Sequence, residues 1–450
     1  MVSPDLRGMP CSSDSAAARD AAEQALRRMM SFHGTPLADL DAAIAADPQW
    51  CLPHVMKAGF LLGLAERSLG PRADEHLAQA HALALHATLR ERAHLDAVQL
   101  LAQGLWHGAC RSWGELLLQQ PRDALALHWA QLWDFYRGDA ISLRQRPARA
   151  LPDWDAADPL QPYVLGLYAF GLEENNLHAL AEDVGRQALA ANAQVPWAVH
   201  AVAHVMEVQG RYEEGSAWLR QHQPAATENS GFASHLWWLK ALFRLEALDI
   251  AGVLRLIDNH LSGEAPRYTL QRVGAASILW RLHLLGEDVS AAGAALLERW
   301  PADDGEAGHH AFNDVHRVLA LLAAAEQGRA EAWVARCAEK AMDVDDARRS
   351  NHATAREVAL PLMRGLLALG RGDADGAVDS LYPLRASVPR LGGSQAQRDV
   401  IDLSVLAAAA RGGRRQIGRA LLNERLMAKP LTPLTRWWVD RLADDEEERA

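Results

Sequence analysis

The feature that most constrains this chain is a turn signal that recurs between short segments of helical character. A glycine is followed five residues later by a small residue in 210–215, 286–291, 372–377 and 413–418, and Gly328 begins a weaker copy. Such a glycine can end a helix in the left-handed conformation, while the small residue lets the next helix pack closely on the first. From residue 286 onward, neighbouring signals lie 41 to 44 residues apart, close to one helical hairpin each. The chain is therefore predicted to repeat helical hairpins.

The spacing of the apolar residues supports this prediction, because most segments show helical rather than alternating periodicity. Pro48, Pro121 and Pro196 mark further hairpin ends. Tetratricopeptide repeats have about 34 residues and comparable turns, whereas the units here are longer and less regular. We expect an all-α fold, an α-α superhelix of tetratricopeptide-like helical hairpins with irregular repeats. An unrelated helical bundle with the same caps is the alternative. The expected organisation is a flexible segment 1–19, a single solenoid over 20–443 and an acidic tail over 444–450.

Composition narrows the classes of partner. The chain of 450 residues has 57 Asp and Glu against 46 Lys and Arg, a net charge of −11, which disfavours nucleic acid as a partner. No apolar stretch approaches the length of a membrane span, and no apolar signal core opens the chain. The four cysteines, Cys11, Cys51, Cys110 and Cys337, lack metal-binding or redox spacing and are predicted to be free thiols. We expect a cytoplasmic protein that binds no membrane.

The most informative motif is a polar stripe on one predicted helix after Pro196. At 100° per residue, His200, His204, Glu207 and Arg211 fall within an arc of about 60°. Histidines at i and i+4 can bind one metal ion through neutral imidazoles, but Ala201 follows the first histidine, which excludes the H-E-x-x-H motif. Two interpretations stay open: part of a metal or acid/base site, or a hydrogen-bonded polar layer between hairpins.

A second cluster follows Gly308. His309, Asn313 and His316 share a predicted helical face, while Asp314 points elsewhere, beside His310. If the two helices face each other, His316 is the natural third partner of the first cluster and Asp314 can orient a histidine. The alternative is a helix N-terminus with a capping Asn or Asp.

Other segments carry weaker signals. His235 and Trp238 share a face that can line a groove, although packing also explains the Trp237–Trp238 pair. Arg90 and His94 indicate ordinary helix support or a pocket lining. Trp113, Trp197, Trp218 and Trp280 are expected to fill hairpin seams. No nucleotide-binding glycine loop and no serine-hydrolase elbow is present.

Two runs together resemble a known family. The segment from Tyr163 to Glu174, followed by Trp197 to Arg211, is similar to the signature of the tetratricopeptide repeat protein 38 family. Later motifs resemble that family in the same order, namely 235–238, 277–282 and 312–316. The resemblance covers about residues 35 to 440 and implies a tetratricopeptide-like protein of largely uncharacterised biochemical role. Ser234 and Leu239 depart from the family pattern, which has Asn and His there, so one polar group of that motif is lost.

Two functional hypotheses follow. The first is a protein that binds a peptide or a small molecule in a His- and Trp-lined concave groove, with Arg211, His235, Trp238 and Asn313 as ligand-binding residues beside the polar stripe. The second is an enzyme with His200, His204, Glu207, Asp314 and His316 as catalytic residues, in which His200, His204 and His316 hold a divalent metal or act as general acid and base. Self-association into a homo-oligomer is a further expectation.

Overall fold

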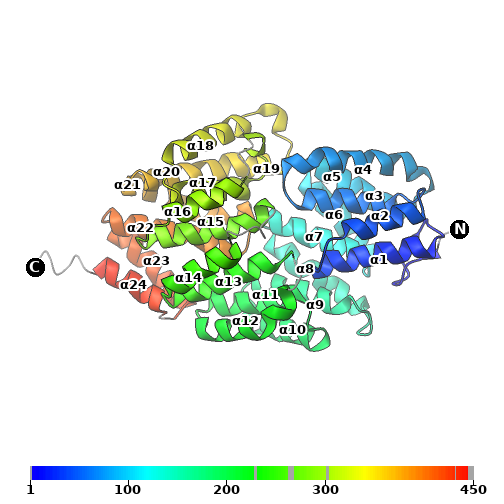
Figure 1. Ribbon diagram of the computed structural model, residues 1–450, viewed down its shortest axis with the longest axis horizontal. Coiled ribbons are helices and arrows are strands. Elements are labelled where there is room, and N and C mark those ends of the chain that lie inside the picture. The colour runs from blue at the N-terminus through cyan, green and yellow to red at the C-terminus, as the bar shows by residue number, and fades with distance from the viewer. Residues whose placement is uncertain (1–2, 228–230, 262–267, 301–303, 431, 444–450) are drawn as a thin grey trace, which may run out of the picture. The chain divides into compact units, whose positions relative to one another are not determined.

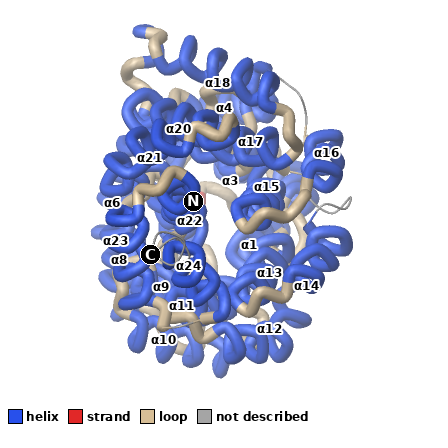
Figure 2. The backbone as a smooth tube through the Cα atoms, turned by 90° about the vertical axis from the view of Figure 1, so that its left-hand side faces the viewer, coloured by secondary structure: helices blue, strands red, loops and turns tan. Residues whose placement is uncertain are grey.

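The computed structural model describes residues 3–227, 231–261, 268–300, 304–430 and 432–443. Within these ranges the chain is almost entirely helical, as the tube in Figure 2 shows, with short loops between the helices. The predicted fold class, an all-α repeat of helical hairpins, is confirmed. The acidic tail 444–450 lies outside the described residues.

Contacts divide the chain into two compact units. The first consists of Met1–Val202, Pro224–Ala233 and Arg348–Ser350, and the second of Ala203–Gln223, Ser234–Ala347 and Asn351–Ala450. The boundary passes through continuous helices, α11 (Pro196–Val208) and α12 (Tyr212–Thr227), so each of these helices belongs to both units. The prediction of a single solenoid over 20–443 stays a prediction.

The first unit is built mainly from helices α1 to α10 (Figure 1). Their bounds are α1 Ala16–Ser31, α2 Leu37–Ala46, α3 Leu52–Gly63, α4 Gly70–Leu83, α5 Leu89–Ala102, α6 Trp106–Gln119, α7 Ala124–Tyr136, α8 Ala140–Ala150, α9 Gln161–Glu173 and α10 His178–Ala191. Consecutive helices pack as pairs, α1 on α2, α3 on α4 and α9 on α10. The first helices of successive pairs, α3 and α5, also pack on each other, which is how stacked helical hairpins build a continuous core.

The second unit repeats this arrangement with the later helices. Their bounds are α12 Tyr212–Thr227, α13 Ala233–Glu246, α14 Ile250–Leu256, α15 Thr269–Leu284, α16 Ser290–Arg299, α17 Ala311–Ala323, α18 Gln327–Ala341, α19 Ser350–Thr354, α20 Leu360–Gly370, α21 Ala374–Leu381, α22 Gln395–Arg411, α23 Arg415–Ala428 and α24 Pro433–Ala443. Short 3-10 or π-helical turns adjoin helices of both units: η1 Arg67–Leu69, η2 Ala84–His86, η3 Leu151–Asp153, η4 Ile257–Leu261, η5 Asp304–Glu306, η6 Val344–Asp346, η7 Ala355–Ala359 and η8 Tyr382–Leu391. Here α15 packs on both α16 and α17, and α20 packs on α21.

The turn signals act largely as predicted. Gly210, Gly286, Gly372 and Gly413 all adopt positive φ, between 67° and 97°, as left-handed helix ends require. Gly328 is different, because it lies inside α18 and the left-handed residue of that turn is Ala325, with φ of 59°. The interpretation of Gly328 as a helix end was therefore wrong, since the turn closes three residues earlier.

The N-terminal segment, expected to be flexible, is anchored from residue 3 onward. Strands β1 (Ser3–Pro4) and β2 (Pro10–Cys11) pair antiparallel. Arg7 is buried and donates to Glu23 at 3.0 Å, and the amide of Ser12 donates to Glu91 at 3.0 Å. These contacts fix the segment against the first helices.

Large and small apolar side chains fill the interior. Trp113, Trp197, Trp218 and Trp280 are all buried, as expected for residues at hairpin seams. The cysteines are free and buried, and burial raises the pKa of Cys11 and of Cys51 to about 12, which keeps these thiols protonated. None of the described helices is both long and apolar enough to cross a membrane. The cytoplasmic location stays a prediction.

Candidate functional site

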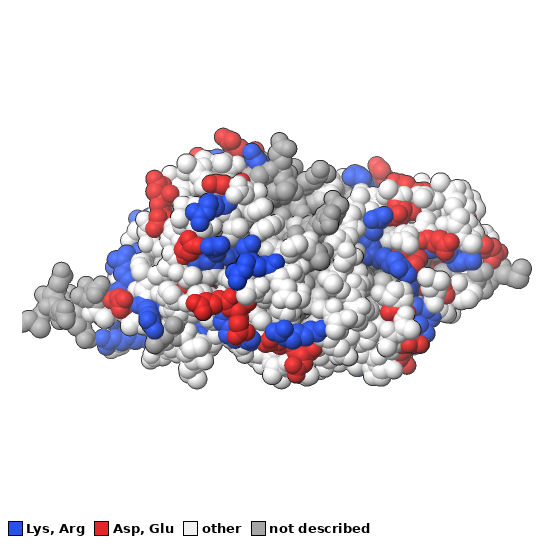
Figure 3. Space-filling view, turned by 60° about the horizontal axis from the view of Figure 1, so that its bottom comes forward, with Lys and Arg blue, Asp and Glu red and all other residues white. Residues whose placement is uncertain are grey.

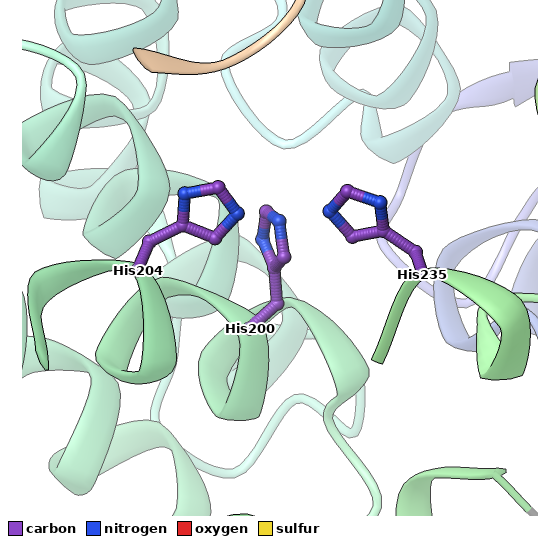
Figure 4. A group of neighbouring side chains, drawn as sticks. All are labelled: His200, His204 and His235. Carbon is purple, nitrogen blue, oxygen red and sulfur yellow. The ribbon is translucent and has the colours of Figure 1, made fainter. Parts of the chain in front are cut away.

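Three histidines converge at helix α11 and the start of α13. His200 and His204 lie one turn apart on α11, and His235 lies in the first turn of α13 (Figure 4). One ring nitrogen from each lies within 4.8 Å of the other two. His200 and His204 are held together by the geometry of one continuous helix. His204 and His235 both belong to the second unit, so contacts inside that unit hold them together.

The environment keeps the described imidazoles neutral. Burial lowers the pKa of His204 well below its ordinary value, and the neighbouring bases His235, Arg398 and Lys429 lower it further. His235 is only partly exposed, and the packing around its ring lowers its pKa to about 3. A neutral imidazole is the form that ligates a metal ion.

Aromatic rings fix the orientation of these imidazoles. His200 contacts Phe170, Trp197 and Phe232, with ring centroids 4.9, 5.3 and 5.1 Å away. His235 stacks on His204 at 5.9 Å and on Trp238 at 4.9 Å. Such packing restricts ring rotation and so preorganises the group.

The stripe on α11 is not an open surface. His200, His204 and Glu207 are 2%, 0% and 2% exposed. Arg211 turns away from the stripe and pairs with Glu214 on α12, where its side chain is partly exposed. The first three residues of the stripe therefore lie in the interior rather than on the surface.

Glu207 faces a buried charge network rather than the histidines alone. Its carboxylate pairs with Lys429, which also lies 3.0 Å from Glu246. Arg425 forms ion pairs with both Glu246, at 2.8 Å, and Asp399, at 2.7 Å. Burial raises the pKa of Glu207 more than Lys429 lowers it. This carboxylate thus has a partner 222 residues away in the chain, which no local pattern indicates.

The second predicted cluster, on α17, is arranged differently from the expectation. His316 is buried, its Nδ1 donates to the carbonyl of Phe312 at 2.8 Å, and burial lowers its pKa to about 4. Within the described residues it joins no group of metal-ligating atoms; His235 takes the third position beside His200 and His204. The sequence missed this placement of His235 because its helix is not related to α11 by spacing.

The neighbours of His316 have other partners. Asp314 accepts a hydrogen bond from the Gly308 amide at 3.2 Å. It also interacts with the thiol of Cys337. Burial raises the pKa of this thiol, and the charge of Asp314 raises it further. Asn313 is partly exposed on α17. His310 is buried, with its pKa lowered to about 3 by burial. Asp314 is therefore tied to the loop before α17 and to α18.

The remaining candidates have packing or hydrogen-bond partners in the interior. Trp238 is fully buried and donates from Nε1 to Ser277 at 2.9 Å, whereas Trp237 is partly exposed and stacks on His260 with centroids 3.7 Å apart. Arg90 and His94 both bind Asp123, at 2.7 and 2.9 Å, in a fully buried cluster. A groove-lining or pocket-lining role for these residues stays a prediction.

Charge on the surface is mixed. On the face shown in Figure 3, Lys and Arg side chains alternate with Asp and Glu side chains rather than forming a field of one sign. This face therefore lacks the continuous basic footprint that a polyanion needs.

No protein-family model matches this chain. Among solved structures, the chain is similar to one described as Naa15/Naa10 bound to HypK-THB, with 11% identity over 96% of this chain and 73% of that chain, at a TM-score of 0.24. A likeness of this size says nothing about function. The resemblance to the tetratricopeptide repeat protein 38 family stays a prediction.

Proposed function

We propose that this protein binds one divalent transition-metal ion through His200, His204 and His235 and uses it in the chemistry of a small molecule. The observation that carries the proposal is the convergence of three imidazole nitrogens within 4.8 Å of one another. Metal–nitrogen bonds of 2.0–2.1 Å place the nitrogens around a tetrahedral ion about 3.4 Å apart. The rings need approach one another by only about 1.4 Å, which small side-chain rotations supply.

The number of ligands favours a catalytic over a structural ion. Structural zinc sites close the coordination shell with four protein ligands, whereas catalytic sites use three and keep a position for water or substrate. An ion in such a site acts as a Lewis acid and lowers the pKa of its bound water. Three histidines therefore support metal-dependent chemistry.

Burial limits what binds at the polar stripe. Of the residues expected to line a peptide groove, His200, His204, Glu207 and Trp238 are all buried. An extended peptide needs an accessible surface, so we infer that the ligand is a small molecule. This conclusion keeps the binding role expected from the sequence and restricts its partner.

Metal titration of the full chain tests the proposal. Isothermal titration calorimetry with Zn²⁺, together with the visible absorption of Co²⁺, should give one ion per chain. His204→Ala should weaken binding at least about a hundredfold, since even loss of an outer partner of a ligand costs ten- to a hundredfold.

His316→Ala is the matched control, because it removes another buried histidine and should leave binding unchanged. Unchanged binding in His204→Ala would contradict the proposal. Equal losses in the His204 and His316 variants, with wild-type binding in His235→Ala, would instead support the set His200, His204 and His316.

A further inference from the structure

One buried arginine of the second unit has no close carboxylate partner among the described residues. Arg281 lies in α15 and is 2% exposed. Its Nη2 donates to the carbonyl of Ala396 at 2.8 Å, and its Nη1 donates to the carbonyl of Ser277 at 3.3 Å. Its Nε has no hydrogen-bond partner, and no carboxylate of the described residues lies within 4.0 Å of the guanidinium. Among the described residues, backbone carbonyls alone accept hydrogen bonds from this buried charge.

Several other buried arginines have carboxylate partners. Arg90 lies 2.7 Å from Asp123, and Arg425 lies 2.7 Å from Asp399 and 2.8 Å from Glu246. A buried charge is costly unless it is paired, so these pairs are the arrangement that stability favours. Arg281 departs from that arrangement, because its Nε has no hydrogen-bond partner and no carboxylate of the described residues lies within 4.0 Å.

The acids nearest to Arg281 are already engaged. Asp399 and Glu207 act on Arg281 over a longer distance, but Asp399 is bound to Arg425 and Glu207 to Lys429. Burial outweighs their attraction and lowers the pKa of Arg281 to about 10. The attraction of these acids therefore does not complete the site.

Two further groups suit an anion. The Ala396 carbonyl that holds Arg281 belongs to the first turn of α22, whose N-terminal end carries the positive end of the helix dipole. His316 lies near enough for the charge of Arg281 to lower its pKa. Because Nδ1 of His316 donates to Phe312, its Nε2 is left as an acceptor for a hydroxyl hydrogen.

We propose that Arg281 is the docking group for the oxyanion of a small molecule, a carboxylate or a phosphate. The oxyanion supplies the missing counter-ion and accepts from Nε, and the first turn of α22 adds favourable potential. His316 is a positioning residue that accepts from a hydroxyl of the same ligand. The proposal does not depend on a metal ion, because Arg281 belongs to no group of metal ligands.

Binding of two probes to the full chain tests the proposal. Calorimetry and thermal unfolding with inorganic phosphate and with acetate, at constant ionic strength, should show that one of them binds and raises the unfolding temperature. The anion that does so distinguishes phosphate from carboxylate. Arg281→Met should weaken binding about tenfold or more, since hydrogen bonds to charged groups are lost, whereas Arg281→Lys should retain part of it.

The stability of the anion-free variants separates docking from a structural role. Arg281→Met should unfold at the same or a higher temperature than the wild type, because an unpaired buried charge is removed. Arg90→Met, the matched control, should unfold at a lower temperature. Three results would overturn the proposal. The first is a fall in unfolding temperature as large in Arg281→Met as in Arg90→Met. The others are an unchanged response of Arg281→Met to the anions, and no response of the wild type to either anion. Zn²⁺ binding by Arg281→Met should equal that of the wild type, whatever the anions show.

Discussion

Two buried polar clusters that contain histidine differ in the group at their centre. In the first unit, a carboxylate organises the cluster: Asp123 binds Arg90 at 2.7 Å and His94 at 2.9 Å, and it caps α7 through the amide of Ala126. At the junction of α11 and α13, imidazoles converge on one another instead. Histidine thus belongs to an ion-paired network in one place and, in our proposal, to a metal site in the other.

Hydrogen-bond chemistry explains why the first cluster is closed. Trp113 Nε1 is only a donor, and it lies 3.2 Å from Nδ1 of His94, so Nδ1 accepts and Nε2 donates to Asp123. Every polar side-chain group on this path has a defined role. A closed network stabilises the fold and offers no coordination position, whereas converging neutral imidazoles can take up an ion.

The largest effect is expected from opening the first cluster. Asp123→Ala leaves Arg90 buried without a counter-ion and removes the cap of α7, so the free energy of unfolding should fall by about 3–5 kcal/mol. Urea unfolding measures it, with the exposed Glu213→Ala as a control expected within about 0.5 kcal/mol of the wild type. A fall in the free energy of unfolding of less than about 1 kcal/mol would show that the cluster does not stabilise the fold.

The next effect comes from acid. Burial lowers the pKa of His128, in the first unit, to about 4, so the folded state keeps this imidazole neutral while the unfolded state takes up a proton below its ordinary pKa of 6.5. Stability is full above pH 6.5 and is lost as the pH falls, by about 3 kcal/mol from this group at pH 4. Urea unfolding between pH 7 and 4 should show a smaller loss in His128→Gln.

His86→Gln, at an exposed position, is the matched control for His128. An equal pH dependence in His128→Gln and the wild type would show that protonation of His128 does not oppose folding.

A milder change tests the edge of the closed network. Trp113→Phe keeps most of the ring but leaves Nδ1 of His94 without its donor, which should cost about 2 kcal/mol. Differential scanning calorimetry would detect the lowered melting temperature. Trp113→Phe in the Asp123→Ala background should cost less, and full additivity would argue that the two contacts are independent.

The smallest effect on stability is expected at the converging histidines. His204→Leu replaces a buried imidazole by an apolar side chain of similar size, so the metal-free protein should change by less than about 1 kcal/mol. Metal binding should nevertheless be lost. A destabilisation as large as that of Asp123→Ala would mean that the imidazoles are a structural network like the first.

Local signals predicted the helices and many of their ends. The left-handed glycines at 210, 286, 372 and 413 follow from backbone sterics within a few residues. At Gly328 the same reasoning failed, because Ala325 adopts positive φ in a turn where no glycine is available. The cap of α7 by Asp123 is likewise local, but its pairing with Arg90 joins residues 33 apart.

The candidate site was only partly predictable. The i and i+4 spacing brought His200 and His204 together, because a helix of 3.6 residues per turn fixes that relation. The placement of His235 rather than His316 beside them depends on how α11 and α13 pack, which periodicity does not encode. Arg281 carried one signal, a charge inside an otherwise apolar segment, but its lack of a carboxylate partner is visible only in three dimensions.

The sequence by itself therefore determined the all-helical class, the repeated hairpins and the residue types on each helix face, since periodicity and caps act over a few residues. The tertiary structure decided which faces are buried, that Glu207 pairs with Lys429 and that three imidazoles meet. The physical reason is that burial and charge pairing depend on residues far apart in the chain. Their partners are chosen by packing and not by spacing.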